Sequence, residues 1–285
     1  MFPDAKRFAE KKIKLIRAFC WDTKCINIKI MKKANINSRE IWLEKESQHY
    51  LFHFKKNSYA SKLIDIVISE QEQCFKDISQ LLRTVPVQKI QYWLCDSAEE
   101  VGQKSNSPEC NGITCCEDGT VNIYCVYSEN MKCTGYHEDT HAVAYFYNDI
   151  NSNALAEGLA MYMDKRWWSV ENELCTFVYI ENNIYVSVER MICERNSNDE
   201  EYFLDIDDCY SYPIMGAFVA FLVEQKGADN FLRLYSYNGT NWKVEFFKIY
   251  GRSLSEIEKE FIYYISSKKY TDNQKTDAHS KLCTE

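Results

Sequence analysis

Two histidines and a glutamate within five residues form the most chemically distinctive segment of the chain. The segment His137-Glu138-Asp139-Thr140-His141 places two imidazoles four residues apart. On a helix, side chains four residues apart lie on one face and can converge on a single metal ion. Glu138 follows the first histidine by one residue, so on a helix its carboxylate lies beside the histidine pair. This arrangement is typical of metal-assisted hydrolysis, in which the acid accepts a proton from an attacking water.

The residues around the motif favour a helix. An apolar, helix-compatible run follows His141, and no proline or glycine occurs before Gly158. The chain has only five histidines, so a chance pairing at this spacing is uncommon. The alternative is a pair of structural histidines without a ligand, and a third metal ligand would argue against it.

Glu157 is the candidate for that third ligand. Residues 148–153 are polar and turn-like, and 154–165 return to a helical pattern with Asn153 as the expected N-cap. Glu157 falls in the first turn of this second helix, which a short connection can fold back onto the first. Gly158 beside it is expected to permit close approach to the histidine helix. Catalytic zinc takes three protein ligands and keeps one position open, and His137, His141 and Glu157 meet that count.

The motif His137-Glu-x-x-His141, followed by Glu157-Gly-Leu-Ala160, resembles the gluzincin metallopeptidases, in particular the bacterial families described as peptidase MA-like. The resemblance covers about residues 46–266 and includes, with weaker similarity, the segments around Gly216 and Gly251. It implies a zincin-like fold, Glu157 as the third zinc ligand, and hydrolysis of peptide bonds.

Two further positions, Tyr212 and Met161, bear on this resemblance. Related gluzincins place a tyrosine or histidine opposite the metal, where it stabilises the charge that forms on the carbonyl oxygen. Tyr212 matches that residue by its place before the helix around Gly216, although a packing role remains open. Thermolysin-like enzymes have an aspartate four residues after the ligand glutamate to support a histidine. Met161 stands there, so the supporting role falls to Asp164 or to a backbone carbonyl.

The remaining pattern predicts an α+β protein with a mixed N-terminal sheet subdomain, an active-site helix and a mainly helical C-terminal subdomain. We expect four regions: an N-terminal helix and strand extension at 1–45, an α/β subdomain with the histidine helix at 46–150, a helical subdomain with the third ligand at 151–267, and a flexible tail at 268–285.

Hydrophobic periodicity predicts individual elements within these regions. Helices are expected at 58–82, 214–226, 241–250 and, as one long helix, about 171–193, and strands at 50–54, 89–94, 112–114 and 121–126. The strand at 121–126 leads toward the histidine helix. If its edge were free, it could pair with an extended peptide substrate.

Composition narrows the class of protein. The chain has 285 residues, 46% hydrophobic and 27% charged, which is typical of a folded globular protein. A formal charge of −8 argues against a nucleic-acid partner, since phosphate binding needs clustered basic residues. No segment approaches the apolar length of a transmembrane helix. The first twenty residues have no apolar signal-peptide core, which predicts a cytoplasmic protein, or an extracellular one if a leader precedes this sequence.

Thirteen cysteines are present, and five of them fall between Cys110 and Cys133. The odd number and the lack of an export signal predict mostly free thiols. Structural zinc sites show repeated cysteine pairs two to four residues apart, and this region does not, so free thiols are favoured over a second metal site.

Together these features predict a zinc-dependent peptide hydrolase acting on a peptide or protein substrate. His137, His141 and Glu157 hold the metal, and Glu138 and Tyr212 act in catalysis. The alternative is a zinc-stabilised, non-hydrolytic module on the same fold that binds a peptide or protein.

Overall fold

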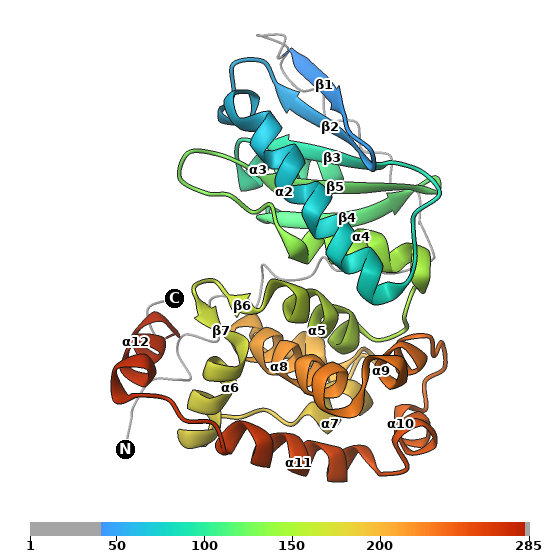
Figure 1. Ribbon diagram of the computed structural model, residues 1–285, viewed down its shortest axis with the longest axis vertical. Coiled ribbons are helices and arrows are strands. Elements are labelled where there is room, and N and C mark those ends of the chain that lie inside the picture. Colours follow the sequence, from blue (N-terminus) through green and yellow to red (C-terminus); the bar gives the residue numbers. More distant parts are fainter. Residues whose placement is uncertain (1–40, 283–285) are drawn as a thin grey trace. The chain divides into compact units, whose positions relative to one another are not determined.

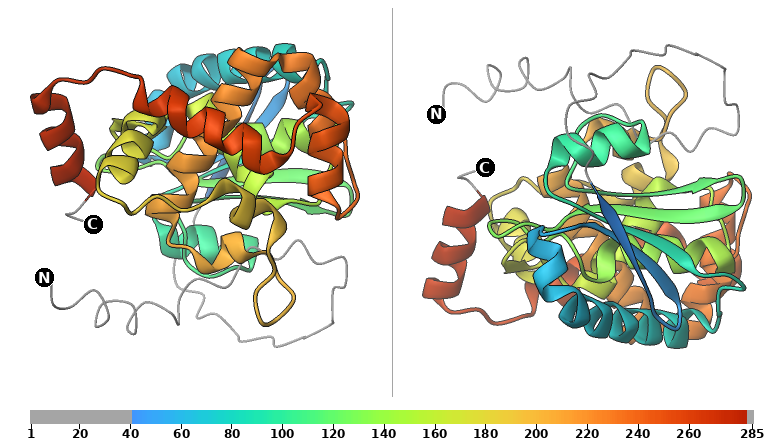
Figure 2. Two further views of the ribbon diagram at one scale, coloured as in Figure 1. Left: turned by 90° about the horizontal axis from the view of Figure 1, so that it is seen from below. Right: turned by 90° about the horizontal axis from the view of Figure 1, so that it is seen from above.

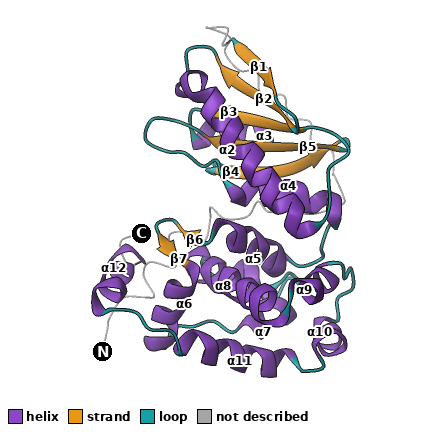
Figure 3. Cartoon of the chain, in the orientation of Figure 1, coloured by secondary structure: helices purple, strands orange, loops and turns teal. Residues whose placement is uncertain are grey.

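The computed structural model describes residues 41–282. The helix and strand predicted for the N-terminal extension therefore lie outside the described residues, and the strand that starts at Trp42 was not predicted. Within 41–282 the protein is α+β, with one five-stranded mixed sheet, one two-stranded hairpin and eleven α-helices. Strands gather in one part of the chain and helices dominate the other (Figure 3).

The chain divides into two compact units (Figure 1). The sheet unit comprises residues 41–70 and 88–134, and the helical unit comprises residues 71–87 and 135–282. The histidine helix belongs to the helical unit, whereas the sequence pattern assigned it to the region with the sheet.

The mixed sheet has the strand order β1-β2-β3-β5-β4. Its strands are β1 (Trp42–Glu46), β2 (Tyr50–Lys55), β3 (Ile90–Cys95), β4 (Gly112–Glu117) and β5 (Thr120–Val126). The pairs β2–β3 and β3–β5 are parallel, and the outer pairs β1–β2 and β4–β5 are antiparallel. The predicted strands are confirmed. The hypothesis that the strand at 121–126 has a free edge for a peptide substrate is wrong, because β5 pairs with β3 on one side and with β4 on the other.

Helices cover both faces of this sheet. The first half of α2 (Tyr59–Leu82) lies along one face, and α3 (Ala98–Ser105) lies on the other (Figures 1 and 2). On α2, Ala60, Ile64 and Val67 recur at helical spacing and are buried. Alternate residues of β2 and β3 point to that face, and Phe52 and Tyr92 are fully buried there.

The described cysteines are free thiols, in agreement with the sequence prediction. Several of them pack with apolar residues on the α3 side of the sheet. This small core includes Cys95 and Tyr124, with Cys110, Cys115 and Cys133 packed against it. Burial raises the pKa of the Cys95 thiol to about 12, so it stays protonated and behaves as an apolar side chain.

The helical unit holds the remaining elements. They are α4 (Tyr136–Tyr147), α5 (Asn153–Asp164), β6 (Arg166–Trp167), β7 (Val170–Glu171), α6 (Asn172–Glu181), α7 (Val188–Cys193), the 3₁₀ helix η1 (Tyr202–Asp205), α8 (Asp208–Lys226), α9 (Ala228–Tyr235), α10 (Trp242–Tyr250), α11 (Leu254–Ser266) and α12 (Asp272–Leu282). A helix, α12, occupies most of the region where the sequence predicted a flexible tail.

Helix α8 is the core of this unit, and its start differs from the prediction. The sequence predicted a helix from residue 214. Pro213, just before it, has no N–H to bond the carbonyl of Cys209. In the structure α8 begins at Asp208 and contains Pro213. The hydroxyl of Tyr179 donates a hydrogen bond to the Cys209 carbonyl at 2.6 Å and replaces the missing partner.

The long helix predicted for 171–193 is also wrong. The structure has a hairpin at 166–171 and two shorter helices, α6 and α7. Asn183 takes a left-handed conformation between them, with φ +57°. The buried carboxylate of Glu258 accepts four hydrogen bonds at the start of α7, including those from the backbone N–H groups of Val188 and Glu189. A partner seventy residues away thus stabilises a helix start that local pattern does not reveal.

Close packing of α5 on α8 fixes the helix that carries Glu157. A Cβ added at Gly158 would lie 2.8 Å from the Val219 side chain and 3.1 Å from the Met215 carbonyl oxygen. The close approach that Gly158 permits is therefore to α8, and not to the histidine helix as the sequence suggested.

In the described part of the chain, none of the helices combines the length and the apolar character needed to cross a membrane.

The packing at Gly158 leads to a stability prediction. Gly158→Ala should lower the free energy of unfolding by about 1–3 kcal/mol, because the added methyl overpacks the α5–α8 contact. Urea denaturation measures the change. In a Val219→Ala background, which removes the nearest methyl group, the same replacement should cost less. Equal costs in both backgrounds would contradict the assigned contact.

Candidate metal centre

Three side chains from two helices converge at one point in the helical unit. His137 and His141 come from the first turns of α4, and Glu157 comes from α5. The Oε2 atom of Glu157 lies 3.3 Å from Nε2 of His137 and 3.4 Å from Nε2 of His141. All three ligand atoms lie within 4.8 Å of one another. The sequence motif and the glutamate of the next helix are therefore brought together as predicted.

The residues fit a metal ion. Two ligand atoms each about 2.1 Å from a tetrahedral zinc are about 3.4 Å apart, which matches both nitrogen–oxygen distances. Nε2 of His141 and Oε2 of Glu157 are buried and have no hydrogen-bond partner. Buried polar atoms are normally satisfied, and a cation shared between these two atoms would satisfy both. No other group of three such ligands occurs among residues 41–282.

Exposure of the ligands decreases along the site. The side chain of His137 is 24% exposed, that of His141 11%, and that of Glu157 7%. The carboxylate is thus buried, and both imidazoles are partly exposed, His137 more than His141. A catalytic metal needs such an opening for water and substrate.

The start of α4 is held by residues on either side of the ligands. Gly135 is the N-cap with φ +142°, a conformation that suits glycine. The side chain of Gln71, on α2, donates to the Gly135 carbonyl at 3.0 Å and to the fully buried carboxylate of Asp139. Thr140 donates to the carbonyl of Tyr136. These bonds fix the first turn, which carries His137 and Glu138.

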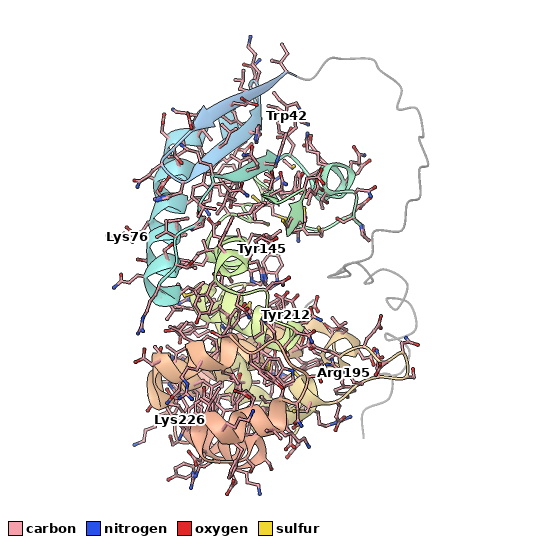
Figure 4. The ribbon with its side chains drawn as sticks, turned by 90° about the vertical axis from the view of Figure 1, so that its right-hand side faces the viewer. Trp42, Lys76, Tyr145, Arg195, Tyr212 and Lys226 are labelled. Carbon is pink, nitrogen blue, oxygen red and sulfur yellow. The ribbon has the colours of Figure 1, made fainter. Side chains whose placement is uncertain are left out.

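The start of α5 is held by two oxygen-bearing side chains. The hydroxyl of Ser152 accepts from the N–H of Leu155 and is the N-cap, so the prediction of Asn153 was wrong by one residue. The buried carboxylate of Glu201 accepts from the N–H groups of Asn153 and Ala154. Glu201 also pairs with Arg195, which is labelled in Figure 4. A negative charge at a helix N-terminus is favourable, and it fixes the turn before Glu157.

The opposite charges of His137 and Glu157 shift the pKa values of these two groups in opposite directions. Burial disfavours the imidazolium form of His137, but the adjacent Glu157 carboxylate outweighs it and raises the pKa of His137 to about 9. Burial likewise opposes ionisation of Glu157, but the two histidines hold its pKa well below the ordinary value. Without a metal, the cluster is therefore a buried ion pair that holds its own ligand geometry.

Tyr212 lies against the metal ligands. It comes from the second turn of α8 and is labelled in Figure 4. Its ring stacks on that of His137, with the ring centroids 6.0 Å apart. The charge of the Glu157 carboxylate acts on the Tyr212 hydroxyl. Burial and the neighbouring carboxylates raise the pKa of Tyr212 well above its usual value, so the hydroxyl keeps its proton. Glu138 is half-buried, and its charge acts on both His137 and Tyr212.

Asp164, one of the two supporting candidates for the histidines, lies at this site. Its carboxylate lies beside Gly135, the N-cap of α4, and its charge contributes to the raised pKa of His137. Met161 is buried in the α5–α8 contact. Its carbonyl accepts from the side chain of Asn172, so its role is packing.

Sequence reasoning missed several residues of the site. Asp208 lies four residues before Tyr212 on α8, and its charge reaches Glu157 and His137. Burial raises the pKa of Asp208 to about 6. Asp208 and Tyr212 are four residues apart, so a helix that begins at residue 208 places them on one face. That spacing was the available signal for Asp208. Gln71 had no such signal, because it acts across more than sixty residues of sequence.

The chain matches no known protein-family model and no curated protein sequence. The site must therefore be interpreted from its own geometry.

The raised pKa of His137 predicts how metal binding depends on pH. With a pKa of about 9, His137 carries a proton at pH 7 that a metal must displace. Zinc binding at pH 7 should release close to one proton, and the affinity should rise by about tenfold per pH unit from pH 7 to pH 9. Titration calorimetry in buffers of different ionisation enthalpy measures the protons released. An affinity independent of pH over this range would contradict the assignment.

Proposed function

We propose that this protein is a zinc-dependent peptide hydrolase with a zincin-like fold, related in mechanism to the gluzincin metallopeptidases. The observation that carries the proposal is the convergence of His137, His141 and Glu157, two of whose buried ligand atoms have no hydrogen-bond partner. The same three residues form the His-Glu-x-x-His and glutamate pattern of that class. A mixed sheet followed by a helical unit is compatible with such a fold.

Two nitrogen ligands and one carboxylate favour zinc over softer or harder metals. His137, His141 and Glu157 would hold the ion. When bound, zinc supplies Lewis acidity, which polarises a carbonyl and makes a coordinated water more acidic. The ligands are complete within the helical unit, and the partly exposed face of His137 is where substrate would enter.

Glu138 is the general base in this proposal. It follows the first ligand directly, lies on the fixed first turn of α4, and is close enough to influence the charge on His137. Its carboxylate accepts a proton from the attacking water as the oxygen bonds to the carbonyl carbon. It then donates that proton to the leaving amine nitrogen as the carbon–nitrogen bond breaks.

Tyr212 stabilises the developing negative charge. Its hydroxyl retains its proton at neutral pH beside the charge of Glu157, and its ring packs against His137. A hydroxyl donor held in this way needs little reorganisation when the carbonyl oxygen becomes negative. Burial among Trp167, Phe203 and His137 fixes its orientation.

Replacing the proposed base tests the mechanism. Glu138→Gln should lower kcat on peptides by at least about a hundredfold, because the amide cannot accept the water proton. Zinc content, measured by elemental analysis, should stay near one per chain. Glu157→Gln is the matched variant, and it should lose zinc. Peptidase turnover retained in Glu138→Gln would exclude Glu138 as the base. A zinc-loaded protein that binds peptides but cleaves none would favour the non-hydrolytic module.

Removing the hydroxyl of Tyr212 tests its proposed role in stabilising the negative charge on the carbonyl oxygen. Tyr212→Phe keeps the ring packing and should lower kcat by about 10²–10³-fold, with little change in KM or zinc content. Tyr263→Phe, on an exposed side chain of α11, provides the control and should retain full activity. A kcat for Tyr212→Phe within about threefold of the parent value would leave Tyr212 with a packing role only.

A further inference from the structure

The hairpin after α5 has an unusual tip. Strands β6 and β7 are joined by the two residues Trp168 and Ser169. Trp168 has φ +52°, a left-handed conformation that favours glycine and is unfavourable for a bulky residue. Its indole is also 57% exposed. Among the positive-φ residues of the described chain it is the only aromatic one. The turn itself would be better served by glycine, so a role outside the fold must account for this side chain.

A continuous series of rings leads from this tip to the metal ligands. The rings of Trp168 and Trp167 are 6.3 Å apart, those of Trp167 and Tyr212 are 5.5 Å apart, and Tyr212 stacks on His137 at 6.0 Å. Phe203 packs on Tyr212 at 5.9 Å. We call Trp167, Trp168, Phe203 and Tyr212 the aromatic wall. It is buried beside His137 and exposed at Trp168.

The wall is fixed in place relative to the ligand helix. The side chain of Arg166 donates to the Ser169 carbonyl and pairs with Glu171 across the hairpin. The backbone N–H of Asn172 bonds the Lys165 carbonyl, just after α5 ends. The hairpin is thus tied to the end of the helix that carries Glu157, and the exposed ring needs little ordering when it binds a ligand.

Charge around the centre narrows the choice of ligand. The carboxylates of Glu138, Asp164 and Asp208 act electrostatically on the His137 and Glu157 pair. An acidic substrate side chain would be repelled there. An aromatic surface beside these carboxylates, with its rings inclined to one another at 59° and 74°, instead suits an uncharged aromatic or large aliphatic side chain, which gains both buried area and ring contacts.

We propose that the aromatic wall is the specificity subsite of the metal centre, and that it selects peptides with a bulky apolar residue, preferably aromatic, next to the cleaved bond. Trp168 supplies the outer surface of the subsite and Trp167 the inner surface. This inference rests on the proposed peptidase function, because it assigns a substrate class to that same site.

Trp168→Gly tests the inference on the full zinc-loaded chain. Glycine suits the turn, so the melting temperature should stay equal or rise, whereas a purely structural tryptophan would lower it on removal. The substrates are two quenched fluorescent peptides that differ only in phenylalanine or alanine at one central position. The parent protein should prefer phenylalanine by about tenfold or more in kcat/KM, and the variant by no more than about threefold, mainly through a higher KM.

Phe247→Ala is the matched control, since Phe247 is 60% exposed on α10 and lies outside the wall. It should keep the parent preference. Three results would overturn the proposal: no preference for phenylalanine in the parent, the full preference retained in Trp168→Gly, or the same loss in Phe247→Ala. In each case peptide cleavage itself would persist and the proposed function would stand. If the zinc-loaded parent cleaves neither peptide nor any member of a random peptide library, the peptidase function fails, and the subsite fails with it.

Discussion

The structure of the helical unit depends on holding two imidazoles and a carboxylate together where water is largely excluded. Each group would be costly to bury alone, and the cluster is tolerated because the charges of Glu157 and the histidines offset one another. That balance requires α4 and α5 to start at fixed positions. Gln71 and Gly135 set the start of α4, and Ser152 and Glu201 set the start of α5. Most of the polar groups buried near the centre therefore serve helix starts, and the ligands follow from them.

The candidate metal ligands could be predicted from the sequence because each of them belongs to a local sequence pattern. Four-residue spacing on one helix defines the histidine pair, and an N-terminal position on the next helix defines Glu157. The strands of the sheet were predicted for the same reason, since alternation is visible within six residues. Local pattern failed wherever a distant group decides the outcome. The break between α6 and α7 depends on Glu258, and Glu201 reaches the start of α5 across more than forty residues.

The border between units was another feature that local pattern could not reveal. The sequence suggested that the histidine helix belongs with the strand preceding it, because the two are close along the chain. Its buried contacts instead include α5 and the second half of α2, where Gln71 holds Asp139 and Asp77 accepts from Tyr136. As a result, all the candidate metal ligands, Glu138 and Tyr212 belong to one compact unit. The geometry described for them needs no assumption about the sheet unit.

Pro213 makes the turn of α8 that carries Tyr212 depend on a neighbouring helix. The turn of α8 that carries Tyr212 lacks one internal hydrogen bond, and the hydroxyl of Tyr179 on α6 supplies the substitute. Before α6 docks, that turn has an open carbonyl and is intrinsically less stable than the rest of α8. Helix α6 also bonds the end of α5, because Asn172 donates to the carbonyls of Met161 and Lys165. A single short helix that carries no candidate ligand therefore supports both the helix of Glu157 and the turn of Tyr212.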